Sequence, residues 1–133
     1  SKCVIAGDNG VRNFVPSYVG FPQDAVSKKL FKKNVLFGEE ALKNRLSIDV
    51  FRPVEKGVLK YSNNPEENPE KYKKTKDIAR LLLSHLIDLV TNGNRKGYVI
   101  RGVIGCPALA SNKNKQALIE ISEGLLDAVL IAS

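Results

Sequence analysis

Residues 98–132, YVIRGVIGCPALASNKNKQALIEISEGLLDAVLIA, decide the fold class. The first part, residues 98–105, is a nearly continuous apolar run of strand length, which predicts a strand buried on both faces. Ser111 can cap a helix that extends to about Leu126, and Ala128–Ala132 is a second apolar strand. A strand, a helix and a strand in this order predict parallel pairing through a right-handed crossover. The sequence therefore predicts an α/β fold.

The segment before this unit predicts the longest helix of the chain, over residues 75–90. Its apolar residues recur at helical spacing and form a broad stripe that includes Ile78, Leu82 and Leu86. An Asn-Gly pair at residues 92–93 predicts a left-handed cap at its end. The polar stretch before it, residues 63–76, contains two prolines and predicts a loop or a frayed helix start.

The start of the chain contains Gly-Asp-Asn-Gly at residues 7–10, which fits either a phosphate-binding loop or the tip of a β-hairpin. No hydroxyl that could reach a phosphate or its metal ion follows the turn, so the hairpin is favoured. A two-residue type I′ turn at residues 9–10 gives good cross-strand pairs. The predicted pairs are Ile5 with Phe14 and Val4 with Val15.

The residues between this hairpin and the long helix predict a small α/β insert followed by a tight loop. Glycine and proline punctuate the stretch, and a few apolar residues can form a small core. A helix is predicted over residues 39–46 and a strand at residues 50–51. Pro53 and Gly57 then bracket the tight loop.

Composition limits the classes of function. The 133 residues suffice for one compact domain, and their formal net charge is +7. The basic residues are scattered among acidic ones without interleaved aromatics, so a solvated surface is favoured over nucleic-acid binding. Cys3 and Cys106 are expected to be reduced, and a single histidine makes zinc improbable. We find no signal peptide and no apolar run long enough to span a membrane.

No catalytic set can be assembled from the sequence. His85 is alone within the predicted long helix, where a position in or beside the core is favoured over catalysis. The chain contains neither a Walker loop nor a Gly-x-Gly-x-x-Gly sequence. We therefore assign no catalytic and no metal-binding residue.

Several short motifs appear in an order that resembles the first lobe of actin-like ATPases, as in actin and bacterial MreB. They are PSYVG at residues 16–20, GEEA at 38–41, RPVEKGV at 52–58 and VIGCPALAS at 103–111. The resemblance covers essentially the whole chain and is greatest to the bacterial branch whose filaments accompany magnetosomes. It implies part of a ribonuclease H-like lobe: a β-hairpin, a small α/β insert, then helix-strand-helix-strand with a mixed sheet. A chaperone-type ATPase of the same fold is disfavoured because the insert is short.

The resemblance also implies a division of the chain. Residues 1–16 and 53–133 would be part of subdomain IA, and residues 17–52 would be subdomain IB. We expect the chain to be an N-terminal piece of a longer protein, with the first phosphate loop before its first residue. The turn at residues 7–10 would then be the hairpin between the second and third strands of the family.

Two sets of site residues follow from the resemblance. One lies beside the nucleotide cleft and comprises Pro53, Glu55, Lys56 and Gly57, although at Lys56 actin has a histidine and bacterial members commonly an aspartate. A structural turn that seats IB on IA is the alternative for this loop. The other is a polymer interface, for which an internal core of IB is the alternative; its residues are Phe21, Val26, Leu30, Phe31 and Phe37.

The resemblance implies a parent protein that binds ATP with Mg²⁺, hydrolyses it and self-associates into cytoplasmic filaments. Such filaments would position magnetosome-type organelles, with organelle-associated proteins as possible partners. The chain alone is expected to bind no ATP and to be inactive. The alternative function is a basic interaction module that binds nucleic acid or an acidic protein partner.

Overall fold

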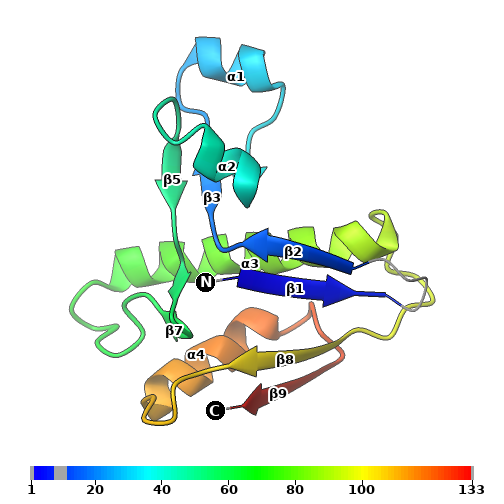
Figure 1. The fold of residues 1–133 in the computed structure, drawn as a ribbon. Coiled ribbons are helices and arrows are strands. Elements are labelled where there is room, and N and C mark those ends of the chain that lie inside the picture. Colours follow the sequence, from blue (N-terminus) through cyan, green and yellow to red (C-terminus); the bar gives the residue numbers. More distant parts are fainter. Residues whose placement is uncertain (1, 8–11, 133) are drawn as a thin grey trace.

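The computed structural model describes residues 2–7 and 12–132. Figure 1 shows the long helix α3 crossing the middle of the molecule, with the hairpin β1–β2 on one side of it. The elements in chain order are β1 (Lys2–Ala6), β2 (Arg12–Pro16), β3 (Val19–Phe21), α1 (Ala25–Phe31), β4 (Leu36–Phe37), α2 (Glu39–Lys43), β5 (Asp49–Phe51), β6 (Val54–Glu55), β7 (Val58–Leu59), α3 (Pro69–Thr91), β8 (Arg101–Gly105), α4 (Asn112–Ser122) and β9 (Ala128–Ala132). This arrangement confirms the predicted mixed α/β class. Among the helices of the described residues, none is both long and apolar enough to cross a membrane.

Helix α3 is the central packing element of the chain. Its buried face includes Ile78, Leu82 and Leu86 at helical spacing, which pack beneath the hairpin and the small sheet. Burying each such side chain stabilises the fold by about 1.5–3 kcal/mol. The helix starts at Pro69, six residues before the predicted residue 75. Proline is well tolerated at the first helical position, because the backbone N–H that it lacks would have no hydrogen-bond partner within the helix. The predicted left-handed cap at Asn92 is confirmed, with φ 54°.

The hairpin β1–β2 is antiparallel as predicted, but its register differs by one residue. Val4 lies opposite Phe14 and Cys3 opposite Val15, whereas the prediction paired Val4 with Val15 and Ile5 with Phe14. Five residues separate the last pair, Ala6 and Arg12, and this odd number is incompatible with a two-residue turn in an unbroken ladder. The predicted turn itself, residues 9–10, lies outside the described residues.

The unit β8–α4–β9 has the predicted parallel pairing, from Arg101 opposite Ala128 to Gly105 opposite Ala132. Ser111 caps α4 as predicted, since its hydroxyl accepts a hydrogen bond from the Asn114 backbone N–H at 3.0 Å. The prediction that β8 is buried on both faces is wrong. Exposure alternates along the strand, and Val103 is 72% exposed, because α4 covers only one face of this pair.

The strands β4, β3 and β5 form a separate antiparallel sheet with helices α1 and α2, at the top of Figure 1. Its core contains Leu36, Ala41 and Ile48. Gly20 packs closely in this core, because a Cβ at this position would lie 2.4 Å from Ile48 Cδ1 and would force that side chain to shift. Helix α2 ends earlier than the predicted residue 46, and the remaining residues continue as turns. The small sheet contacts α3 through Phe37, whose ring stacks on that of His85 at 4.2 Å.

Candidate functional site

The predicted tight loop is a β-hairpin formed by β6 and β7, with Val54 opposite Leu59 and Glu55 opposite Val58. Its two turn residues, Lys56 and Gly57, both have positive φ, 52° and 77°. Positive φ at both positions is typical of a type I′ turn, which favours asparagine followed by glycine. A lysine in this conformation is therefore mildly strained, and such strain is often found at functional positions.

The tip of this hairpin is in close contact with the end of β8. A Cβ on Gly57 would lie 2.9 Å from the Gly105 carbonyl oxygen and 3.1 Å from both Cys106 Cα and Pro107 Cδ. A side chain is therefore excluded at this position by space as well as by its positive φ. The contact fixes the hairpin tip against the segment that leads from β8 toward α4.

A single asparagine holds the hairpin to α4. The Asn114 side chain is 1% exposed. Its Oδ1 accepts hydrogen bonds from the Leu59 backbone N–H at 2.9 Å and the Ser62 hydroxyl at 3.0 Å. Its Nδ2 donates to the Gly57 carbonyl oxygen at 3.1 Å. One side chain thus satisfies three polar groups of the hairpin and its exit, which sets the height and orientation of the turn.

The entry to the hairpin is held by Arg52. Its guanidinium lies 5.5 Å from the centroid of the Tyr18 ring, and its Nη1 lies 3.4 Å from Glu55 Oε1. The structure thus brings the predicted cleft residues together on one hairpin: Pro53 is buried at its base, while Glu55 and Lys56 are exposed. Glu55 is paired with Arg52, and Lys56 is the cationic residue of this set.

Sequence reasoning missed Asn114, which holds the hairpin that it had singled out. The only local signal is an asparagine in the first turn of a helix already capped by Ser111. Such a residue is usually interpreted as part of the cap. Its partners are more than fifty residues away in the chain, so no local pattern could identify them.

The residues of the predicted polymer interface fall into two groups. Val26 and Leu30 lie one turn apart on α1 and are 77% and 71% exposed. The three phenylalanines of the set are partly buried in the chain's own clusters: Phe21 and Phe37 against α3, and Phe31 against the small sheet. Only the α1 pair therefore presents large apolar side chains to a partner.

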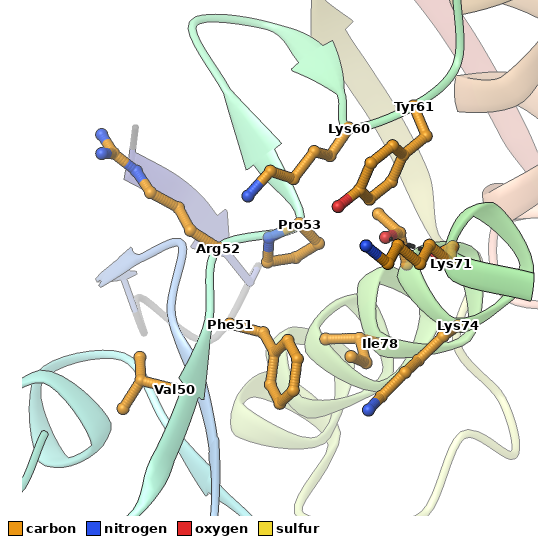
Figure 2. A pocket seen from close by; sticks show the side chains of 10 residues that line it. Val50, Phe51, Arg52, Pro53, Lys60, Tyr61, Lys71, Lys74 and Ile78 are labelled. Carbon is orange, nitrogen blue, oxygen red and sulfur yellow. Dashed lines mark hydrogen bonds between the residues drawn. The ribbon is translucent and has the colours of Figure 1, made fainter. Parts of the chain in front are cut away.

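A pocket of about 380 Å³ lies beside the base of the hairpin, between the end of β5, the residues after β7 and the first turns of α3 (Figure 2). Four of its ten lining residues are cationic, and none is acidic. Figure 2 shows the Tyr61 hydroxyl between the Lys60 and Lys71 side chains, whereas the Arg52 guanidinium points away from the hollow. No local sequence pattern marks this pocket, because its lysines belong to separate segments.

The remaining candidates for chemistry do not converge. His85 is partly buried on α3 at the core boundary, and desolvation lowers its pKa below 6.5. Cys106 is buried and unpaired, while the side chain of Cys3 lies outside the described set. In the described part of the chain, no three residues among His, Cys, Asp and Glu are placed to hold a metal ion.

Comparison with known proteins identifies the architecture. No family model matches the chain. It superposes on the structure of a MamK double helical filament with a TM-score of 0.77 and 28% identity, over 95% of this chain and 35% of that one. The chain has an actin-like fold. A non-polymerising MamK mutant bound to AMPPNP superposes with a TM-score of 0.75, also at 28% identity, over the whole chain and 38% of that one.

The sequences agree with the structures. The chain is 29% identical along its full length to the actin-like protein MamK of Paramagnetospirillum magneticum and to that of Magnetospirillum gryphiswaldense. It spans about a third of the length of these curated relatives, 35% and 34%. MreB5 of Spiroplasma citri bound to ADP shares the fold at 15% identity, with a TM-score of 0.61 over 95% of this chain and 32% of that one. The predicted resemblance to bacterial actin-like proteins is confirmed.

Proposed function

We propose that the chain forms part of a nucleotide-binding lobe in an actin-like protein that assembles into filaments. The observation that carries this proposal is the superposition of almost the entire chain on a MamK filament subunit at 28% identity. The AMPPNP-bound MamK structure supports nucleotide binding by the parent protein. The activity that we propose for the parent is Mg²⁺-dependent ATP hydrolysis coupled to filament turnover. Its proposed cellular role is to position magnetosome-type organelles in the cytoplasm.

Within this lobe, residues 1–16 and 53–133 serve as part of subdomain IA and residues 17–52 as subdomain IB. The hairpin of Pro53, Glu55, Lys56 and Gly57 lies beside the nucleotide cleft. The phosphate-binding loops and catalytic groups belong to other parts of the parent. The hairpin's role is positional, which fits its attachment to α4 through the buried Asn114.

The exposed apolar residues support contacts with more protein. Val103 and Leu130, on the face of β8–β9 that α4 leaves open, are 72% and 63% exposed. Exposed apolar groups of this size are typical of surfaces that pack against another body. We assign the β8–β9 face to packing within the parent, and Val26 and Leu30 of α1 to the contact with the next subunit in a filament.

The test measures assembly of the full parent polypeptide by sedimentation after addition of ATP and Mg²⁺. Val26→Asp with Leu30→Asp places two charges in the centre of the assigned contact, and we expect at least a tenfold rise in the critical concentration. Lys28→Gln with Lys29→Gln is the matched control, because it changes the charge of the same helix by the same amount. Equal assembly of the two variants would remove α1 from the filament contact. A parent that never sediments with nucleotide would contradict the filament proposal itself.

A further inference from the structure

The pocket beside the hairpin base combines an apolar floor with a cationic rim. Phe51, Pro53 and Ile78 contribute apolar surface, and Phe51 and Ile78 also belong to the packed layer beneath it. Lys60, in the segment after β7, and Lys71, on α3, both line the hollow (Figure 2). A ligand that fills this pocket must therefore offer both an apolar group and negative charge.

The lysines that line the pocket take part in no ion pair of the described residues. Among the described residues, no carboxylate lies within ion-pair distance of Lys60, Lys71 or Lys74. Arg52, the fourth cation of the lining, is already paired with Glu55 and directed away from the hollow. Like charges gathered without counter-charges repel one another, and a ligand that brings carboxylates relieves this repulsion.

The backbone beneath the rim is held in an uncommon conformation. Tyr61 has a φ of 69°, a left-handed value that is rare for an aromatic residue. Its hydroxyl lies between the Lys60 and Lys71 side chains in Figure 2, where it can donate a hydrogen bond to an oxygen of an anionic ligand. The Lys60 backbone N–H donates to the Pro53 carbonyl oxygen at 3.0 Å, which fixes the segment that carries Tyr61.

We infer that this pocket binds an acidic segment of a partner protein, with one apolar side chain on the Phe51–Ile78 floor and flanking carboxylates on Lys60 and Lys71. The cationic lining favours a ligand with negative charge, and the apolar floor favours a peptide over a free inorganic anion. Nucleic acid fits less well. Phe51 is the pocket's aromatic ring on the floor, and the Lys74 ammonium already lies 4.6 Å from its centroid, which leaves less of the ring for base stacking than for contact with a small apolar side chain.

The test uses the full parent polypeptide and a labelled peptide with one central phenylalanine flanked by aspartates and glutamates. Binding is followed by fluorescence anisotropy at about 50 mM salt, where interactions between exposed charges are weakly screened. We expect Lys60→Gln with Lys71→Gln to weaken binding at least tenfold. Lys28→Gln with Lys29→Gln, which removes the same charge from α1, should leave the affinity unchanged. Circular dichroism establishes that both variants remain folded.

Three further binding measurements test which ligand the pocket takes. A peptide with serine in place of phenylalanine should bind several-fold more weakly, and equal binding would overturn the role of the floor. Displacement of the peptide by millimolar inorganic phosphate would indicate a simple anion site and overturn the proposal. Tighter binding of a single-stranded oligothymidylate than of the peptide would do the same in favour of nucleic acid. Because this measurement needs no nucleotide and no filament, its failure is distinct from failure of the proposed assembly function.

Discussion

The β6–β7 hairpin and helix α1 both present residues that the sequence singled out, yet the chain holds them in opposite ways. The hairpin is fixed by three hydrogen bonds to a buried Asn114, by the close contact at Gly57 and by the fully buried Leu59. Helix α1 has seven residues, of which only Ser27 is buried. The Ser27 hydroxyl donates a hydrogen bond to the Ser47 carbonyl oxygen at 3.2 Å.

This difference separates two kinds of candidate site. A hairpin whose backbone is determined by distant residues can hold a side chain at a set position beside a ligand. A helix whose apolar residues face outward contributes little to its own lobe, so those residues can be selected for contact with another molecule. Substitutions should therefore affect stability strongly in the hairpin and weakly at the outward-facing Val26 and Leu30 of α1.

The largest loss of stability is expected for Asn114→Ala. The substitution leaves the Leu59 N–H, the Ser62 hydroxyl and the Gly57 carbonyl without their partner in a buried position. We expect the free energy of unfolding to fall by about 2–4 kcal/mol, measured by chemical denaturation. Asn112→Ala, on the exposed side of the same helical turn, is the control and should change it by less than about 0.5 kcal/mol. Similar values for the two variants would show that the hairpin is held by something other than Asn114.

A smaller loss is expected for Gly57→Ala. The new Cβ would meet the Gly105 carbonyl oxygen at 2.9 Å, and its residue would adopt a φ of 77°. The left-handed conformation alone costs about 1–2 kcal/mol, and the contact adds to it. Gly93→Ala is the matched control, since φ there is 79° and nothing lies within 4 Å of the new Cβ. The difference between the two midpoints in denaturant isolates the contact with β8; equal losses would mean that the hairpin tip can move away from it.

The same contrast explains how far the sequence allows prediction. Helix α3, the cap at Ser111 and the parallel pairing of β8 with β9 follow from periodicity and local signals, and all were predicted. The register of β1–β2 was missed because the prediction assumed a two-residue turn, whereas five residues connect the paired strands. Apolar cross-strand pairs are possible in both registers, so the sequence of the strands distinguishes them only weakly. Helix α1 and strand β4 are too short to give a periodic signal. Asn114 and the lysine-rimmed pocket arise from contacts between distant segments, which no local pattern encodes.

The junction between the small sheet and α3 should respond to pH through His85. Burial lowers the His85 pKa, an effect that Lys33 strengthens and that Asp88 and Glu40 partly oppose. His85 therefore binds a proton more readily in the unfolded chain than in the folded one. The free energy of unfolding should be highest above about pH 6.5, where His85 is neutral in both states, and should fall as the pH drops below that value. The thermal midpoint should be lower at about pH 5.5 than at about pH 7.5. In His85→Gln this pH dependence should be reduced, and an unchanged dependence would assign it to other groups.

The smallest change in stability is expected for Leu30→Ser on α1, although this helix is assigned to the filament contact. In Leu30→Ser, the replaced side chain is 71% exposed in the chain, so little buried apolar area is lost. We expect the free energy of unfolding of the unassembled protein to change by less than about 0.5 kcal/mol. Phe31→Ser, one residue along, removes a ring that packs against the small sheet and should cost more than about 1 kcal/mol. Denaturation of both variants without nucleotide measures this difference. If Leu30→Ser destabilised the protein as much as Phe31→Ser, Leu30 would be a structural residue of its own lobe, and the division between a rigidly held hairpin and an outward-facing helix would fail.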